Sequence, residues 1–302
     1  MNINTVGEIL RFYREKYSLN QNDVCAGICS VSTLSKIENG SKEADSLILE
    51  TLLERIGKEA LQFEMILNDY DYSLWELRRQ IETEMEHDKK DIARQLLQEY
   101  EEKMPQDDNV HSQFVLYHRI LLEDDKQTED RCAMANQALR YTCPDIEKAV
   151  LYHEMEIELI ILLVKKRYAE FEEGKEWLAA ILKVVQNIYT GRKKERISAK
   201  LLMELTMLEW NDKNYRGAIK CADKAIDVIS HSRSIEYIGE LHLIKAKALE
   251  KFYHGKDWDK EEDNCKNECL MSYYTFDIMK NENGKQEVQK FCEEKLQWQI
   301  IK

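Results

Sequence analysis

Apolar residues recur three and four positions apart along most of this chain, the spacing that places them on one face of an α-helix. Near the N-terminus this pattern predicts one helix over Thr5–Tyr17 and two shorter ones over Asn20–Ile28 and Val31–Asn39. A fourth helix is expected to begin with Ser46 as its N-cap and to end at Gly57, since serine hydroxyls cap helices and glycine ends them. Two short helices joined by a tight turn form a helix-turn-helix unit.

The same period continues to the C-terminus, with no run of alternating apolar and polar residues that would indicate a strand. The chain has only 2 Pro and 10 Gly, so few residues interrupt helices and an all-α protein is predicted. Pro144 is expected at a helix start, where its missing N–H costs nothing. The expected helix pairs are 73–86 with 91–104, 110–122 with 128–141, 145–166 with 169–189, 194–210 with 215–229, and 235–252 with 259–279, followed by a terminal helix at 285–300.

The fourth pair has the pattern of a tetratricopeptide repeat most clearly. Its second helix carries Ala218, Ala222 and Ala225 at helical spacing, and such small residues let the paired helix approach closely. Stacked pairs of this kind curve into a solenoid with a concave face. We therefore predict a helix-turn-helix domain over residues 1–67, followed over residues 68–302 by a right-handed α-solenoid of tetratricopeptide-like (TPR-like) helix pairs.

The polar residues of the second short helix have the chemistry of a DNA-reading surface. Leu34 and Ile37 share its buried face because they lie three positions apart. This leaves short hydroxyls and one cation for base edges and phosphates. Asn39 and Gly40 both tolerate the left-handed conformation that a helix C-terminus needs. The candidate DNA-binding residues are Gln21, Ser30, Ser32, Thr33, Ser35, Lys36, Asn39 and Lys42.

Three stretches of this region carry a family resemblance. Leu19-Asn20-Gln21 and Leu34-Ser35-Lys36-Ile37-Glu38-Asn39-Gly40 resemble the Cro/C1-type (XRE) helix-turn-helix. Together with Gly27-Ile28-Cys29-Ser30 they resemble the Rgg/PlcR-type (RRNPP) transcriptional regulators of Firmicutes. Most Cro/C1-type sequences carry Gly at the position of Cys29 and have a turn one residue longer, so the shorter turn fits the Rgg/PlcR variant better.

This resemblance implies a function for both predicted domains. In these regulators the helix-turn-helix binds double-stranded DNA, with a glutamine at the position of Gln21 bonding a phosphate, and the repeat domain senses a short peptide pheromone in quorum sensing. The chain is then expected to be a homodimer. Methionine and aromatic side chains on a curved helical surface suit a partly apolar peptide. The repeat pattern aims Lys200, Met203, Met207 and Trp210 at the concave face, and looser alignment adds Gln113, Tyr117, His153, Glu156 and His242 as candidate peptide-binding residues.

The charge of the chain limits how strongly it can hold DNA. The net charge is −13, and residues 1–57 contribute −2 of it from six basic and eight acidic residues, which leaves −11 for the remainder. A basic stripe of the usual strength is therefore missing from the sequence. We expect weak nonspecific affinity and a dependence on dimerisation, with helix N-termini, hydroxyls and a few cations making the contacts.

Catalytic and metal-binding motifs are missing from the sequence. It contains no P-loop, GxGxxG, GxSxG or HExxH motif, so we expect neither an enzyme nor a cofactor. The eight cysteines are dispersed without the spacing of a four-ligand zinc site, so reduced thiols and no metal are expected. As a minor alternative, Cys25 with Cys29 and Cys265 with Cys269 lie one helical turn apart and leave a metal or redox site open.

The sequence also bounds where the protein acts. No signal peptide is visible, and the most apolar run, residues 159–164, is too short to span a membrane. We therefore expect a cytoplasmic protein with no membrane partner. Two alternatives to a peptide-controlled regulator stay open: an interaction scaffold whose repeat domain binds a protein partner, and a repressor that needs no ligand. Measured DNA binding separates the scaffold from both regulators.

Overall fold

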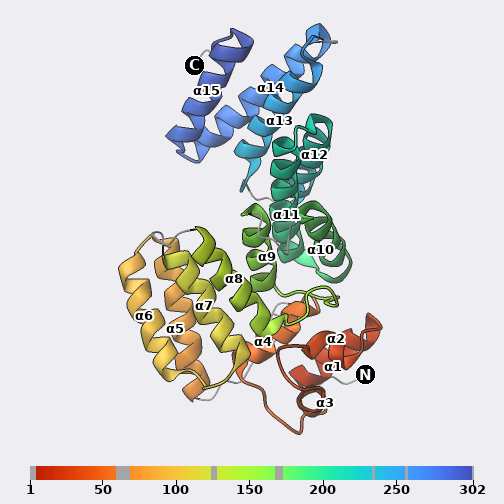
Figure 1. Cartoon of the computed structure of the whole chain (residues 1–302), viewed down its shortest axis with the longest axis vertical. Coiled ribbons are helices and arrows are strands. Elements are labelled where there is room, and N and C mark those ends of the chain that lie inside the picture. Colours follow the sequence, from red (N-terminus) through yellow and green to blue (C-terminus); the bar gives the residue numbers. More distant parts are fainter. Residues whose placement is uncertain are drawn as a thin grey trace. The chain divides into compact units, whose positions relative to one another are not determined.

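A computed structural model describes residues 5–58, 69–123, 128–166, 173–232, 235–255 and 258–300, and all regular secondary structure within these ranges is helical. The predicted all-α class is confirmed for this part of the chain (Figure 1). The helices are α1 (Val6–Lys16), α2 (Gln21–Cys25), α3 (Val31–Glu38), α4 (Ser46–Arg55), α5 (Asp69–Glu86), α6 (Lys90–Lys103), α7 (Asn109–Leu122), α8 (Thr128–Thr142), α9 (Glu154–Lys165), α10 (Gly174–Ile188), α11 (Gly191–Asn211), α12 (Tyr215–Ser232), α13 (Ile238–Tyr253), α14 (Trp258–Ile278) and α15 (Glu282–Leu296).

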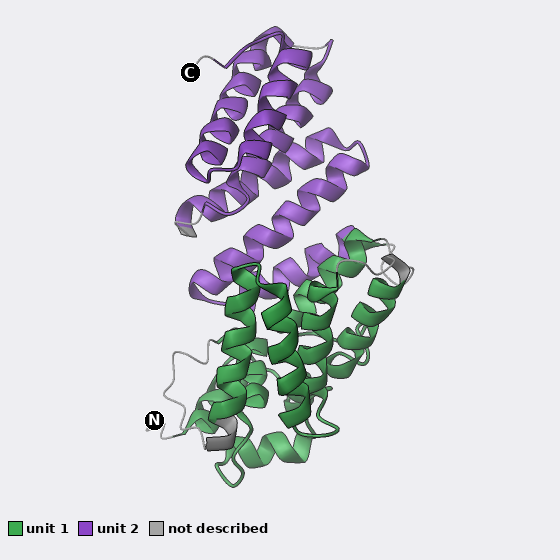
Figure 2. Ribbon diagram, turned by 90° about the vertical axis from the view of Figure 1, so that its left-hand side faces the viewer, with its two compact units in different colours: residues 1–174 green, residues 175–302 purple. Residues whose placement is uncertain are grey.

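The chain forms two compact units, residues 1–174 and 175–302, which Figure 2 colours separately. Within the first unit α5 packs on α6 and α7 on α8, and within the second α11 packs on α12 and α13 on α14. These four predicted helix pairs are confirmed. The predicted domain boundary between residues 67 and 68 lies outside the described residues, and it stays a prediction, as does the right-handed solenoid.

Local signals account for the first three helices. Thr5 and Asn20 each accept from the backbone N–H three residues ahead and form capping boxes with Glu8 and Asp23. Ser30 caps α3 as predicted, with its hydroxyl accepting from the N–H of Thr33 at 3.0 Å. The apolar faces of these helices meet in a closed core, in which Leu10, Val24 and Leu34 are completely buried.

The cap of α4 differs from the prediction. Asp45, and not Ser46, is the N-cap residue, because its carboxylate accepts from the N–H groups of Leu47 and Ile48. Ser46 is only 2% exposed, and its hydroxyl accepts from Arg78 of α5 at 3.2 Å. The serine therefore helps attach α4 to α5. Gly57 ends the helix in the left-handed conformation, as predicted.

The helix predicted over residues 145–166 is too long by its first nine residues. Helix α9 begins at Glu154, and residues 144–153 form a turn followed by chain without regular secondary structure. Pro144 consequently lies in this segment and not at a helix start. His153 is the residue before the helix, and its N–H donates to the carboxylate of Glu156 at 2.9 Å. Leu151 and Tyr152 are buried although they are not helical, so burial in this segment comes from tertiary contacts.

The second unit is held by small and sulfur-containing side chains. Ala218, Ala222 and Ala225 of α12 are completely buried, as expected of positions where a paired helix approaches closely. Cys265, Cys269 and Cys292 are also completely buried, in the core formed by α13, α14 and α15. All eight cysteines are free thiols. Among the described residues there is no group of three or more His, Cys, Asp or Glu side chains that could hold a metal ion.

No helix within the described ranges is long and apolar enough to cross a membrane.

Candidate nucleic-acid interface

The outer face of α3 presents the polar groups that the sequence singled out. Ser32 and Lys36 are exposed and Ser35 is half-buried, while Leu34 and Ile37 on the opposite face are 0% and 4% exposed. This arrangement leaves hydroxyls and one ammonium group free of the core on a single short helix. Such groups can donate to phosphates and to base edges in a major groove.

The two ends of α3 add further polar groups. At its start, the hydroxyls of Ser30 and Thr33 lie 3.0 Å apart and hydrogen-bond. At its end, the side-chain oxygen of Asn39 accepts from the N–H of Ser41 at 3.0 Å, so its amide NH₂ group points away from that bond. Lys42 is exposed in the loop that follows. All eight predicted DNA-binding residues therefore belong to α2, α3 and the chain directly beside them.

An internal ion pair orients Gln21 at the start of α2. Its side-chain NH₂ donates to Glu38 at 2.9 Å, and Glu38 is 3% exposed. Arg14 of α1 holds the same carboxylate through two N–H groups, at 2.6 and 2.9 Å. This hydrogen-bonded pair raises the pKa of Arg14. Arg14 thus connects α1 to α3 and places Gln21.

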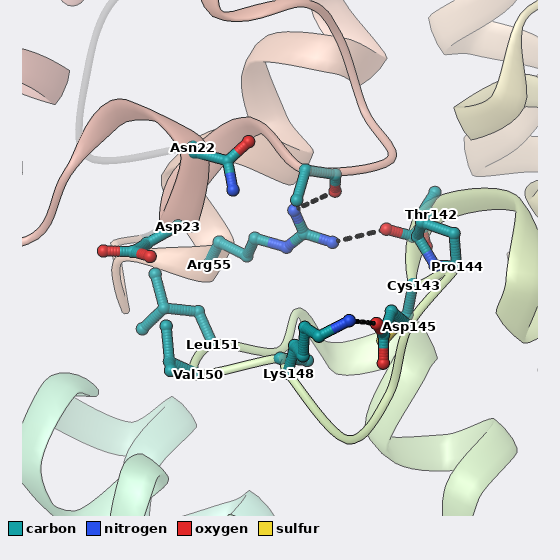
Figure 3. A pocket seen from close by; sticks show the side chains of 12 residues that line it. Asn22, Asp23, Arg55, Thr142, Cys143, Pro144, Asp145, Lys148, Val150 and Leu151 are labelled. Carbon is teal, nitrogen blue, oxygen red and sulfur yellow. Dashed lines mark hydrogen bonds and ion pairs between the residues drawn. The ribbon is translucent and has the colours of Figure 1, made fainter.

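Arg55 of α4 connects the helix-turn-helix to the following helices, and sequence reasoning missed this role. The residue is 2% exposed. One terminal nitrogen donates to the carbonyls of Val24 and Ala26, at 3.1 and 2.6 Å. The other donates to the carbonyl of Thr142 at 2.9 Å and to the carboxylate of Glu156 at 2.6 Å. Figure 3 shows the guanidinium extending toward the segment that begins at Thr142. The signal in the sequence was a cation in the last turn of a leucine-rich helix.

The acceptor of this ion pair is one of the predicted peptide-binding residues. Glu156 is completely buried and also accepts from the hydroxyl of Thr142 at 2.7 Å. Burial opposes ionisation, but Arg55, His153 and the Thr142 hydroxyl outweigh it and hold the pKa of Glu156 below its ordinary value. Glu156 is therefore a buried anion with its partners already in place.

Gln113 and His153 lie in the same buried network. Gln113, 1% exposed, donates to the Thr142 hydroxyl at 2.7 Å and to the carbonyl of Ala138 at 3.0 Å. His153 is 2% exposed and lies 3.5 Å from the Glu156 carboxylate. The sequence placed Gln113, His153 and Glu156 on an open concave face; the structure instead places them in the interior, where they hold α7, α8 and α9 together.

Further contacts attach the helix-turn-helix to this unit. The imidazole of His111 on α7 lies 3.1 Å from the Asp45 carboxylate and hydrogen-bonds the hydroxyl of Tyr100 at 2.6 Å. Asn109 donates to the carbonyl of Gly27 at 3.0 Å. Beside Arg55, a pocket of about 170 Å³ opens between α2 and residues 142–151 (Figure 3). The DNA-reading domain is consequently fixed to its neighbours by polar contacts as well as by apolar packing.

The remaining peptide-binding candidates have more varied surroundings. Lys200, Met203, Met207 and Trp210 are all half-buried on α11, and Tyr117 on α7 is half-buried too. His242 is 7% exposed, and its imidazole lies 2.5 Å from the carboxylate of Glu268 on α14. The structure thus encloses His242 between α13 and α14. The four residues of α11 are spaced as one stripe, and their contact with a peptide stays a prediction.

Comparison with known proteins supports the predicted architecture. Residues 10–63 match a family model described as helix-turn-helix. PlcR from Bacillus thuringiensis, solved in complex with the peptide PapR7 and DNA, is 15% identical with a TM-score of 0.57, over 95% of this chain and 99% of that one. The apo form of PlcR is 14% identical with a TM-score of 0.54, covering 94% and 97% of the two chains.

A third solved structure agrees with these two. The apo form of the competence regulator ComR from Streptococcus vestibularis is 15% identical with a TM-score of 0.51, over 95% of this chain and 96% of that one. No curated protein matches the sequence. At these identities the similarity establishes the fold. The chain therefore carries a helix-turn-helix domain at residues 10–63 and has the fold of the PlcR and ComR regulators, to which its motifs pointed.

Proposed function

We propose that the protein is a sequence-specific, DNA-binding transcription regulator that works as a homodimer and is controlled by a short signalling peptide. The observation that carries the proposal is the helix-turn-helix itself, with Ser32 and Lys36 exposed on α3. The solved complex of PlcR with a peptide and DNA supports it, because that protein shares this fold. A transcription regulator acts on the chromosome, so the proposed location is the cytoplasm.

In the proposed mode of binding, α3 enters the major groove and α2 crosses the phosphate backbone. The Ser32 hydroxyl and the Lys36 ammonium group reach base edges or phosphates, and Gln21, oriented by Glu38, bonds a phosphate. One copy offers few cations, because the net charge of residues 1–57 is −2. Two copies on neighbouring half-sites double the contacts, so the homodimer is part of the proposal.

The proposed peptide site lies on α11, where Lys200, Met203, Met207 and Trp210 form the half-buried stripe. Methionine side chains adapt to varied apolar partners, and the ammonium group of Lys200 suits a peptide carboxylate. A peptide changes DNA binding only if it binds one arrangement of the helices more tightly than the other arrangements. The Arg55–Glu156 contact gives the helix-turn-helix a direct connection to the helices of its own unit.

The decisive experiment is fluorescence-anisotropy binding to the DNA upstream of the protein's own gene, at several salt concentrations. Ser32→Ala/Lys36→Ala is expected to bind at least tenfold more weakly than the wild type. The matched control is Lys290→Ala, which removes an exposed cation from α15 and should leave affinity unchanged. Peptides from neighbouring reading frames are expected to shift wild-type affinity tenfold or more, about 1.4 kcal/mol of coupling.

Each alternative has its own result in this assay. Equal binding by the wild type and the double variant would reject α3 as the reading helix. Sequence-specific binding that no peptide changes would favour a repressor without a ligand. Failure of every protein to bind DNA would favour the interaction scaffold.

A further inference from the structure

The pocket between α2 and residues 142–151 lies within the first compact unit and takes no part in the proposed binding of DNA or peptide. Its volume, about 170 Å³, is close to that of a cavity of about 150 Å³ that holds one benzene molecule. Ala26, Ala149, Val150 and Leu151 contribute apolar groups to its lining. Val150 is 48% exposed, so part of this apolar surface is uncovered. The pocket therefore has the size and the lining for one small, partly apolar molecule.

A buried hydrogen-bond donor lies beside this pocket. A guanidinium group has five N–H donors. Four of those on Arg55 are taken up by hydrogen bonds to Val24, Ala26, Thr142 and Glu156. The fifth, on Nε, is buried and has no hydrogen-bond partner among the described residues. Figure 3 shows the Arg55 side chain on one side of the pocket and Lys148 and Leu151 on the other. Because an unpaired buried donor is unfavourable, a ligand that offers an acceptor gains by pairing with it.

The wall of the pocket opposite α2 is held in place although it is not helical. Arg140 of α8 donates to the carbonyl of Pro144 at 2.8 Å. Further along, the hydroxyl of Tyr152 donates to the carbonyl of Ala149 at 3.2 Å, and Tyr152 itself is 5% exposed. These bonds fix both ends of the wall before any ligand arrives. A ligand then loses little of its binding energy to ordering the site.

The charges around the pocket favour a neutral ligand. Arg55 is paired with the buried carboxylate of Glu156 at 2.6 Å, so its positive charge is already compensated. Lys148 is likewise paired with Asp145 at 2.5 Å. The other carboxylate of the lining, Asp23, makes the surroundings slightly negative and disfavours an anionic ligand. The Nε donor therefore calls for an uncharged acceptor such as a carbonyl oxygen.

We infer that this pocket is a binding site for a small, neutral molecule with an apolar body and a carbonyl group. The carbonyl oxygen accepts from Nε of Arg55, and the apolar body lies against Val150 and Leu151. Such a molecule contacts α2 and the segment 142–151 at once, so it strengthens the attachment of the helix-turn-helix to the helices of its unit. The site itself does not depend on the proposed function, and only an effect of its ligand on DNA binding rests on that function.

The first test titrates three probes of similar size into the full chain and follows the methyl resonances of Val150 and Leu151 by NMR. Acetophenone carries a carbonyl group, ethylbenzene lacks an acceptor, and benzoate is an anion. Acetophenone is expected to shift both sets of resonances saturably and to bind at least about tenfold more tightly than either of the other probes.

Every other result of this titration counts against the site. If none of the three probes produces saturable shifts, the pocket holds only water and the proposal is overturned. Ethylbenzene that binds as tightly as acetophenone would exclude pairing with Nε of Arg55. Benzoate that binds as tightly as acetophenone would exclude the neutral class of ligand.

A pocket-filling variant locates the binding. Ala149→Leu adds a larger side chain to the lining and changes none of the groups that hydrogen-bond to Arg55. It is expected to lose the acetophenone shifts while keeping the helical content measured by circular dichroism. Ala133→Leu, the same substitution at an exposed position of α8, is the matched control and should bind like the wild type. Wild-type affinity in a folded Ala149→Leu would place the binding elsewhere, and the three probes on the wild-type chain decide the question if this variant unfolds.

The second test asks whether the ligand strengthens the attachment of α2. At acetophenone concentrations ten times its Kd, hydrogen exchange of the Val24 and Cys25 amides is expected to slow about tenfold in the wild type and to stay unchanged in Ala149→Leu. Exchange that is unaffected at saturation would overturn this effect of the ligand. Probe binding by a protein that fails to bind DNA would reject only the proposed function, whereas DNA binding without probe binding would reject only this site.

Discussion

Gly27 lies where the helix-turn-helix meets the chain that follows α8, and this position has no room for a side chain. Its φ is +76°, and a Cβ atom there would lie 2.0 Å from the carbonyl oxygen of Thr142. Gly40, after α3, has almost the same backbone, with φ of +72°, but a Cβ atom there meets nothing within 4 Å. An alanine at Gly40 would therefore suffer backbone strain alone, whereas an alanine at Gly27 would suffer the same strain and a steric clash with Thr142.

We expect Gly40→Ala to lower the free energy of unfolding by about 1 kcal/mol, the cost of a left-handed alanine. Gly27→Ala carries the same strain and in addition forces Thr142 away, so it should lower stability by at least about 2 kcal/mol more. Urea denaturation of both variants measures the difference. Equal losses would mean that the contact between Gly27 and Thr142 contributes nothing to stability.

At the scale of elements, the contact between α4 and α5 contains a carboxylate with an unusual proton affinity. Burial raises the pKa of Glu50 to about 7 from its ordinary 4.5, and Arg78 of α5, 3.6 Å away, offsets only part of this effect. Burial also raises the pKa of Glu82 on α5. Because folded Glu50 binds its proton more tightly than unfolded Glu50 does, the contribution of this proton to stability is complete below pH 4.5 and is lost as the pH rises through 7.

Glu50→Gln should therefore have nearly wild-type stability at pH 4.5 and should exceed the wild type at pH 8, by at most about 3 kcal/mol. Denaturation by urea between pH 4.5 and 8 provides the measurement. Glu76→Gln, which changes an exposed carboxylate on α5, is the control and should follow the wild type throughout. If Glu50→Gln is less stable than the wild type at pH 8, its ionised form helps to hold α4 on α5.

The periodicity of apolar residues predicts these elements well because it reports which helical face is buried. It predicted α3 from Leu34 and Ile37, which are buried as expected, and Ala218 in the core between paired helices. It failed between Cys143 and His153, where Leu151 is buried by tertiary contacts and not by a helical face. A spacing of three to four residues between apolar positions does not distinguish burial on a helical face from burial by tertiary contacts.

The candidate site shows the same limit more sharply. The capping and exposure of α3 are local, so the sequence was sufficient to place Ser30, Ser32 and Lys36. The repeat pattern is equally compatible with Glu156 lying on the concave face and with Glu156 lying in the interior. Only its partner Arg55, 101 residues away, decides between them. A polar residue in the interior is identified by the group that pairs with it, and that group lies beyond the reach of local spacing.

At the scale of the whole molecule, the ion pair between Arg55 and Glu156 bears on where the first domain ends. The sequence predicts a boundary between residues 67 and 68, while the first compact unit extends to residue 174 and contains both partners. A buried pair that loses one member leaves an uncompensated charge, which costs about 3–5 kcal/mol. If the helix-turn-helix unfolds together with α5 to α9, removing either partner destabilises all of these helices at once.

Hydrogen exchange of the full chain tests this coupling. In the wild type we expect the slowest amides of α3, α4 and α9 to open with one common free energy, lowered by about 3–5 kcal/mol in Arg55→Met. Arg55→Met/Glu156→Leu should recover much of the loss because no buried charge remains, although the carbonyls of Val24 and Ala26 still lack their donor. If Arg55→Met lowers protection in α3 and α4 while α9 keeps its wild-type value, the helix-turn-helix opens independently. The boundary predicted from the sequence would then describe the folding units better than the division at residue 174.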